Sequence, residues 1–184
     1  MFRTWYEATI RVNLPSVKQT KNYSCGAGAL RSIAKHYGIE MSEKDFMKLL
    51  KTSYEEGTDP TNLKKTANIL SLNVKEHHNM SINLLKKYLN EGKPIICAIQ
   101  AYGKPKDYKE DKNGHYVIAI GYDKSYIYFE DPVLKGKRGH LKNDEFLKRW
   151  HDYDEGRKFK CYGLVVWKDK KISTHKINKS TKIE

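Results

Sequence analysis

The sequence predicts an α+β fold in which helices fill the first half of the chain and an antiparallel sheet fills the second. Between residues 25 and 92, apolar residues recur at helical spacing, whereas short β-branched apolar runs separated by turns follow residue 93. Helices and strands that are segregated along a chain favour α+β over alternating α/β folds. The 184 residues are enough for one domain, expected over residues 1–167, with a flexible basic tail over 168–184.

An extended arm over residues 1–20 leads into the first predicted helix, which starts near Ser24 or Cys25. Gly38 follows its end, where glycine is favoured because it adopts the left-handed conformation that closes many helices. The apolar stripe of this helix, with spacings of three and four residues, consists of Leu30, Ile33, Ala34 and Tyr37.

Three further helices are predicted from their start signals. Ser42 and Asp45 have the spacing of a capping box. The segment 58–60, Thr-Asp-Pro, places a proline in a first helical turn. Ser81 caps the fourth helix, and Gly92 follows its end. The apolar residues assigned to these helices are Phe46, Leu49 and Leu50 in the second, Leu63, Ala67 and Leu70 in the third, and Ile82, Leu85 and Leu89 in the fourth.

The second half contains four predicted strands, over residues 94–100, 115–122, 126–130 and 161–167. The three residues 123–125 are short enough to form a tight hairpin connection. Asn143 is expected to cap a short helix that carries Phe146 and Trp150. The long polar loop 101–113 is either a lid or substrate-binding loop, or a solvated connection without a special role.

Composition excludes several classes of protein. No stretch of about 18 apolar residues is present, so no transmembrane helix is expected. The N-terminal residues lack the apolar run of a signal peptide, which predicts a cytoplasmic location. The three cysteines lie far apart without a CxxC pair, which argues against a disulfide framework and a zinc ribbon. We expect neither a cofactor nor a metal.

Cys25 and Gln19 form the first part of a pattern that indicates nucleophilic chemistry. Cys25 is expected at the N-terminus of a helix, where the helix dipole and unpaired N–H groups favour a thiolate. Gly26 follows it and lets a substrate backbone approach closely. Gln19 lies on the loop that enters the helix, so its side-chain amide and the Cys25 N–H could together bind an oxyanion.

His115 and Asp131 complete the pattern from the predicted hairpin. His115 opens an apolar strand after Gly114, and Asp131 ends the next strand, before Pro132. Adjacent antiparallel strands can bring the two side chains together, so that Asp131 holds the tautomer of the imidazole and stabilises its charged form. Asp123 is the rival acid, but it lies in the hairpin connection at the far end from His115.

Three blocks, 19–30, 114–122 and 127–132, give the chain a family resemblance. It resembles the bacteriocin-processing, or double-glycine leader, peptidases, a branch of the papain-like cysteine peptidases. The resemblance spans about 14–150 and implies a papain-like fold with a cleft between a helical lobe and a sheet lobe. It implies an oxyanion role for Gln19, with Cys25 as nucleophile, His115 as base and Asp131 as orienting acid. Members often carry an acidic residue directly before the cysteine, where this chain has Ser24.

Four function classes follow from these observations. The first is a cysteine peptidase that cleaves a peptide bond, with a small-residue or double-glycine site as the family expectation. The second is a papain-like transferase or isopeptidase, in which an amine replaces water. The third is an inert peptide-binding module. The fourth is a nucleic-acid or anionic-surface binder, which the net charge of +13 and the basic tail would serve; against it, recognisable nucleic-acid-binding motifs are missing.

The remaining histidines and cysteines are given structural roles. His77 and His78 are neighbours in sequence and would point to opposite faces of a strand, so we interpret them as surface residues rather than metal ligands. His36 lies near a helix C-terminus, where a histidine suits the dipole. His140, His151 and His175 belong to no pattern. Cys97 and Cys161 lie in apolar strands and are expected in the core.

Overall fold

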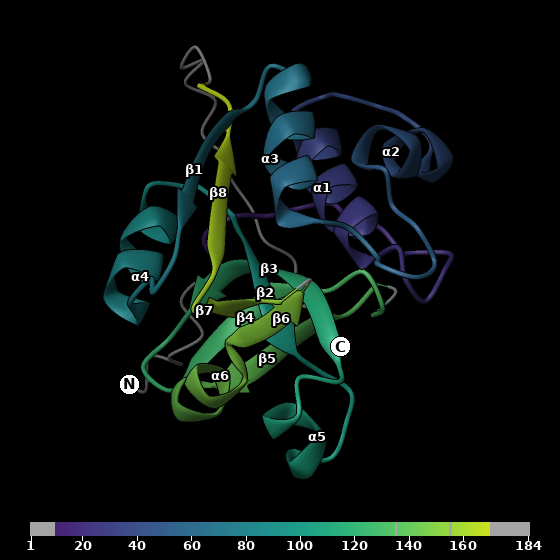
Figure 1. The fold of residues 1–184 in the computed structure, drawn as a ribbon. Coiled ribbons are helices and arrows are strands. Elements are labelled where there is room, and N and C mark those ends of the chain that lie inside the picture. Colours follow the sequence, from purple (N-terminus) through teal and green to yellow (C-terminus); the bar gives the residue numbers. More distant parts are fainter. Residues whose placement is uncertain (1–9, 135, 155, 170–184) are drawn as a thin grey trace, which may run out of the picture.

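The structure is a computed structural model that describes residues 10–134, 136–154 and 156–169. Helices α1 (Cys25–His36), α2 (Glu43–Leu50) and α3 (Pro60–Ile69) form one lobe, and a six-stranded antiparallel sheet forms the centre of the other. In Figure 1 the three helices lie together on the right, apart from most of the sheet. The predicted α+β class is confirmed. The arm before Ile10 and the predicted tail after Asp169 lie outside the described residues.

The sheet has the strand order β1-β8-β2-β3-β4-β5, and every neighbouring pair is antiparallel. Its strands are β1 (Asn73–His77), β2 (Ile95–Gln100), β3 (Gly114–Tyr122), β4 (Tyr126–Glu130), β5 (Arg138–Lys142) and β8 (Gly163–Trp167). All four predicted strands are present, as β2, β3, β4 and β8. Every residue of β2 is buried, as expected for a strand in the interior of a sheet that is covered on both faces.

The predicted starts of the first four helices are also confirmed. The backbone N–H of Asp45 donates to Ser42 Oγ at 3.1 Å, and that of Leu84 donates to Ser81 Oγ at 3.1 Å, at the starts of α2 and α4 (Ile82–Asn90). Asp59 caps α3 through the Thr61 N–H at 2.6 Å. Each cap satisfies an amide that lacks a partner within its helix. Gly38 follows the end of α1 with a φ of +78°, as its predicted role requires.

Leu49, one of the three apolar residues assigned to α2, is 36% exposed, because the core-facing side of α2 is formed by Phe46 and Leu50. One local prediction is wrong. Asn143 is the first residue of α6 (Asn143–Arg149) and not its cap; the N-cap is Lys142. Strand β5 runs directly into this helix, and the Asn143 side chain instead donates to the Lys124 carbonyl in the β3–β4 connection at 2.9 Å.

Several elements were not predicted because their sequences are polar. Strands β1 and β5 are rich in charged residues, and their pairing with buried neighbours makes them strands: β1 pairs with β8, and β5 with β4. A separate hairpin joins β6 (His151–Asp154) to β7 (Arg157–Lys160). The loop 101–113 contains a short helix, α5 (Pro105–Lys109).

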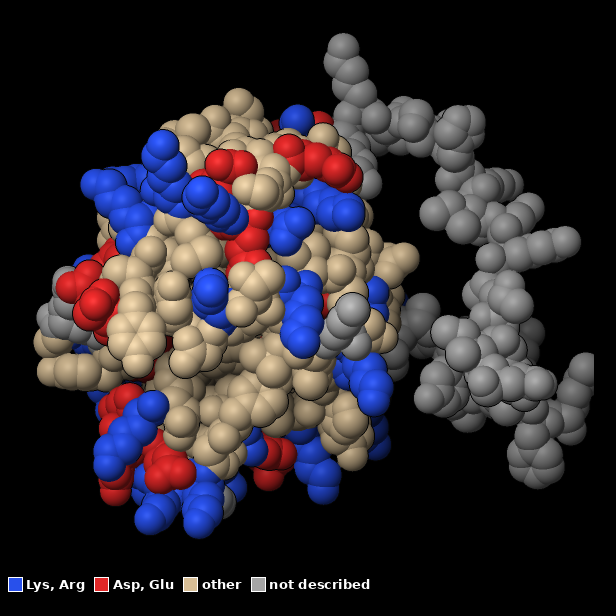
Figure 2. All heavy atoms as spheres, turned by 90° about the vertical axis from the view of Figure 1, so that its right-hand side faces the viewer, with Lys and Arg blue, Asp and Glu red and all other residues tan. Residues whose placement is uncertain are grey.

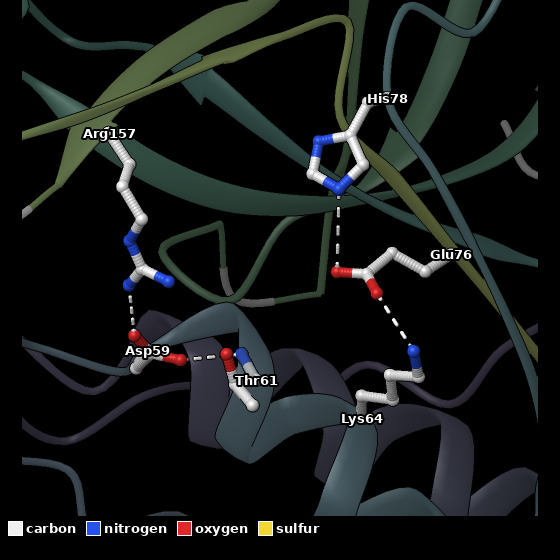
Figure 3. A network of polar contacts seen from close by, with 6 residues as sticks. All are labelled: Asp59, Thr61, Lys64, Glu76, His78 and Arg157. Carbon is white, nitrogen blue, oxygen red and sulfur yellow. Dashed lines mark hydrogen bonds and ion pairs between the residues drawn. The ribbon is translucent and has the colours of Figure 1, made fainter.

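Two ion pairs tie the helical lobe to the strands (Figure 3). Arg157 of β7 contacts Asp59 at the start of α3 at 2.6 Å. Lys64 of α3 contacts Glu76 of β1 at 2.9 Å, and His78 lies 3.8 Å from the same carboxylate. Such partly exposed pairs contribute at most about 1 kcal/mol each. Their importance is therefore geometric, because they link the helical lobe to strands β1 and β7.

Candidate active site

Cys25 is the first residue of α1, as predicted, and its side chain is partly buried. No side chain caps this helix, so its first-turn amides remain available to an anion beside the thiol. Gly26 is required by packing: a Cβ there would lie 2.7 Å from the Thr58 Cβ. Gly28 likewise lies against Pro132, where a Cβ would be only 2.8 Å from the proline. The start of α1 therefore packs closely against two loops.

His115 and Asp131 are joined directly. The His115 Nε2 lies 2.8 Å from Asp131 Oδ1, and both side chains are more than nine-tenths buried. The β3–β4 register explains the contact, because Ile118 pairs with Glu130 and Asp131 therefore continues toward the start of β3. Diagonal neighbours on adjacent strands lie within reach of long side chains. The predicted proximity of these two residues is thus present in the structure.

Cys25 and His115 line the same cleft, and Cys25 lies near enough to raise the pKa of the His115 ring. Since Nε2 faces Asp131, the second ring nitrogen is left for the thiol. Burial by itself lowers the pKa of His115, but the hydrogen bonds and charges of Asp131 and Cys25 outweigh it and raise the pKa to about 10. The arrangement therefore favours the charged, imidazolium form of His115.

Asp131 is held in its charged form by several donors. Burial alone raises its pKa, but the hydrogen bond and charge of His115 and the further donors around the carboxylate bring the pKa below its ordinary value. The backbone N–H of Val133 donates to Oδ1 at 2.9 Å. The hydroxyl of Tyr102 donates to Oδ2 at 2.5 Å. The charged carboxylate is therefore fixed at both of its oxygens.

Tyr102 is a site residue that the sequence did not reveal. Its ring meets the His115 ring edge-to-face, with centroids 5.5 Å apart, and its hydroxyl binds Asp131. Its backbone has a φ of +59°, which is unusual for a residue other than glycine. A tyrosine after a strand is unremarkable by itself, so only the general expectation of a functional loop at 101–113 pointed to it.

Gln19 lies on the loop that enters α1, with 8% of its surface exposed. Its backbone N–H donates to the Pro132 carbonyl at 2.9 Å, which places it beside the segment that carries Asp131. One side-chain N–H donates to the Lys21 carbonyl at 2.7 Å, and Oε1 is buried without a hydrogen-bond partner. The amide has a second N–H, so it retains a donor for a ligand.

The rival acid Asp123 has a structural role, as expected. Its carboxylate accepts hydrogen bonds from the N–H groups of Ser125 and Tyr126 and from the Tyr128 hydroxyl, each at 2.7 Å. These contacts close the β3–β4 connection, at the end of the hairpin away from His115. Asp123 therefore stabilises the turn, while Asp131 contacts the histidine.

The other singled-out residues are mostly structural. Cys97 is buried in the sheet, but Cys161 is only partly buried and precedes β8 with a φ of +46°, so its prediction as a core strand residue is wrong. His77 is half-buried, and its Nε2 lies 3.0 Å from the Tyr88 hydroxyl. His151, which fitted no pattern, contacts Asp111 at 2.6 Å. Within the described ranges, no group of three or more His, Cys, Asp or Glu is arranged to hold a metal ion.

A cleft of about 410 Å³ opens beside Cys25 and His115. One wall is the segment 55–60 before α3, and the other includes the β6–β7 hairpin. The lining, as far as the structure describes it, contains neither lysine nor arginine, although the chain has 35 of them. It contains four carboxylates, those of Glu55, Glu56, Asp111 and Asp152. The cleft therefore differs in charge from the basic protein around it.

The basic residues do not form one continuous patch on the face shown in Figure 2. Blue lysine and arginine side chains are scattered over it, with acidic and uncharged side chains between them. On this face the distribution gives no support to a nucleic-acid interface, which would gather basic residues in one patch or stripe. In the part of the chain that the structure describes, no helix is long and apolar enough to cross a membrane.

The sequence model of the peptidase C39 family matches residues 13–153, most of the chain. The chain belongs to the peptidase C39 family. It is therefore a cysteine peptidase, in agreement with the predicted resemblance. It is 30% identical over 133 residues to the lactococcin-A transport/processing ATP-binding protein LcnC of Lactococcus lactis subsp. lactis, a match that covers 72% of this chain. The match covers only 17% of LcnC, so the chain spans a small part of that relative.

Solved structures of C39 peptidases share the fold. A C39-like peptidase from Bacillus anthracis superposes with a TM-score of 0.70 at 16% identity, covering 89% of this chain and 98% of the other. A double-glycine motif protease from an AMS/PCAT transporter, solved in complex with a leader peptide, gives 0.63 at 20% identity, covering 87% and 95%. At these identities the likeness concerns the fold, and it confirms the predicted papain-like arrangement of a helical lobe and a sheet lobe.

Proposed function

We propose that this peptidase cleaves its substrate through a Cys25–His115–Asp131 triad. The observation that carries the proposal is the hydrogen bond from the His115 imidazole to the buried Asp131 carboxylate, beside a thiol that lines the same cleft as His115. A raised imidazole pKa beside a thiol at a helix N-terminus is the environment in which a cysteine becomes a nucleophile. The open cleft in front of these two side chains provides room for a peptide.

The reaction proceeds by acyl transfer. The Cys25 thiolate attacks the scissile carbonyl carbon, and the oxygen of the tetrahedral intermediate is bound by the Gln19 side chain and the Cys25 N–H. The His115 imidazolium gives its proton to the leaving amine as the C–N bond breaks, which leaves a thioester on Cys25. Water then attacks the thioester with His115 as base, releasing the acid and regenerating the pair. Asp131 orients His115 and stabilises its charge throughout.

The proposed substrate is a peptide with small residues, such as a glycine pair, before the scissile bond. Two observations support this choice. The double-glycine motif protease that shares the fold was solved with a leader peptide, and LcnC is a processing protein by name. In this chain, Thr58 packs against Gly26, immediately beside Cys25, and both Thr58 and Cys25 line the cleft. A substrate residue bound next to Cys25 would meet Thr58, which favours residues without large side chains.

The test is cleavage of a matched set of peptides that carry Gly-Gly, Ala-Ala or Val-Val before one bond, with products identified by mass spectrometry. Cleavage after Gly-Gly that is lost in Cys25→Ser is the expected result. Equal cleavage of all three peptides would overturn the substrate assignment. Binding without cleavage by the wild-type protein would overturn the enzymatic role and favour the inert module. Addition of an amine acceptor reveals a transferase, because the acyl product would then carry the mass of the amine.

A further inference from the structure

Glu43, the first residue of α2, is a buried carboxylate that the proposed mechanism does not use. Only 8% of its surface is exposed. Its oxygens accept the Thr20 N–H at 2.9 and 3.1 Å, and Oε1 accepts the Ser24 hydroxyl at 2.6 Å. Thr20 follows Gln19, and Ser24 precedes Cys25. One carboxylate from another helix therefore contacts the loop directly after the oxyanion candidate and directly before the nucleophile.

The same loop passes these contacts on to the Gln19 amide. Ser24 Oγ lies 3.2 Å from the Lys21 N–H and 3.0 Å from the Lys21 carbonyl. That carbonyl accepts the Gln19 side-chain N–H at 2.7 Å. A connected path of hydrogen bonds thus runs from Glu43 through Ser24 and Lys21 to Gln19. Because each partner has few alternatives in a buried setting, the path restricts both the loop and the direction of the amide.

We propose that Glu43 is a positioning residue that holds the Gln19 side chain in place for the oxyanion. This inference rests on the proposed function, because it assumes that Gln19 binds a developing negative charge. It also gives Ser24 a role, because the Ser24 hydroxyl connects the carboxylate from α2 to the loop directly before Cys25. Glu43 does not touch the substrate and acts only through the loop.

An effect on oxyanion binding can be separated from an effect on thiol reactivity by comparing two reactions of Cys25. Peptide cleavage forms an oxyanion, whereas alkylation by iodoacetamide is a displacement at carbon that forms none. In Glu43→Gln, one of the two accepting oxygens becomes an NH₂ donor that faces other donors, so the loop is released. We expect kcat to fall about tenfold, a fraction of the roughly 100-fold loss that removal of an oxyanion donor causes. Alkylation at pH 6 should be no slower than in the wild type, because the variant only removes a negative charge near the thiolate.

Four further variants make the comparison specific. Gln19→Ala should show the same pattern more strongly, and Glu43→Gln should add little to it in the double variant, because both act on one group. Glu43→Asp keeps the carboxylate and should retain more activity than Glu43→Gln. Glu40→Gln, an exposed residue just before α2, is the matched control and should leave both reactions unchanged. Circular dichroism and thermal unfolding check that each variant folds.

The outcomes separate the two proposals. If Glu43→Gln retains wild-type kcat, or loses kcat and alkylation rate in equal proportion, Glu43 is not a positioning residue for Gln19. Additive losses in the double variant would lead to the same conclusion. A wild-type protein that neither cleaves peptides nor alkylates rapidly would instead overturn the proposed function itself. Should Glu43→Gln not fold, Ser24→Ala breaks the path between Glu43 and Lys21 and is judged by the same two rates.

Discussion

Replacement of Asp131 by asparagine should shift the pH dependence of peptide cleavage. The side chain keeps its shape but loses the charge that holds the His115 imidazolium. With a His115 pKa of about 10, about 99% of the ring is protonated at pH 8, whereas at its ordinary pKa of about 6.5 only about 3% is protonated. Because Cys25 also raises the pKa of His115 and remains in the variant, the loss in kcat/KM should be at most about thirtyfold at pH 8 and less than about twofold at pH 6.

The assay is kcat/KM for one peptide between pH 5 and 10, for the wild type, Asp131→Asn and Asp123→Asn. Asp123 is the matched control, because it lies on the same hairpin and binds only turn residues and Tyr128. The Asp123→Asn variant should lower the free energy of unfolding without moving the pH profile of kcat/KM. If the basic limb of Asp131→Asn coincides with that of the wild type, or if Asp123→Asn moves it equally, the role assigned to Asp131 is refuted.

The raised pKa of His115 also makes the free energy of unfolding depend on pH. The pKa of His115 is higher in the folded protein than in the unfolded chain. Its contribution to the free energy of unfolding is therefore complete below about pH 6.5 and is lost as the pH rises through about 10. Urea titrations of the wild type should show the free energy of unfolding falling across that window, and Asp131→Asn should show a smaller decline.

Three other perturbations follow from the site. Tyr102→Phe should lower kcat about tenfold with KM little changed, since a hydrogen bond to a charged group contributes about 1.5 kcal/mol; steady-state kinetics measures both constants. Gly26→Ala should cost about 1–3 kcal/mol in urea unfolding and impair cleavage, because its Cβ would meet Thr58 at 2.7 Å. A peptide with lysine flanking the scissile bond should be cleaved faster than one with glutamate, and neutralising Glu55 or Glu56 should reduce the preference by roughly two- to fivefold each.

Each of these has an internal comparison. A Tyr102→Phe variant that changes KM alone would assign the ring to substrate binding rather than to Asp131. Gly139→Ala, where a Cβ would lie an ordinary 3.4 Å from Leu134, should be far milder than the change at Gly26. The lysine preference should weaken with added salt and survive Asp144→Asn on α6. If the preference for lysine did not change with salt concentration, it would not arise from the carboxylates of the cleft.

Much of this arrangement follows from local sequence patterns. Ser42, Asp59 and Ser81 mark helix starts because a side-chain cap depends on residues two or three positions away. The contact between His115 and Asp131 could be anticipated because a short hairpin constrains the register of its two strands. The position of Cys25 at the start of α1 follows from the apolar stripe that begins shortly after it.

The remainder depends on contacts between segments that are distant in sequence. Tyr102 reaches Asp131 across 29 positions, and Glu43 reaches Ser24 across 19, so no local spacing marks either residue. Strands β1 and β5 are polar, and they form because each pairs with a largely buried strand: β1 with β8 and β5 with β4. Asparagine is a residue type that often caps helices, but β5 runs directly into α6, so Asn143 lies inside the helix.

The most direct test of the account is the rate of iodoacetamide alkylation at each cysteine between pH 5 and 9, read by mass spectrometry in the wild type and in His115→Ala. Burial raises the pKa of the Cys97 and Cys161 thiols, so both serve as slow internal references. The account predicts that Cys25 alone reacts rapidly at pH 5 to 6 and that His115→Ala abolishes this reactivity. If Cys25 reacts no faster than an ordinary thiol, or remains equally fast without His115, the thiolate–imidazolium pair does not exist and the proposed mechanism is wrong.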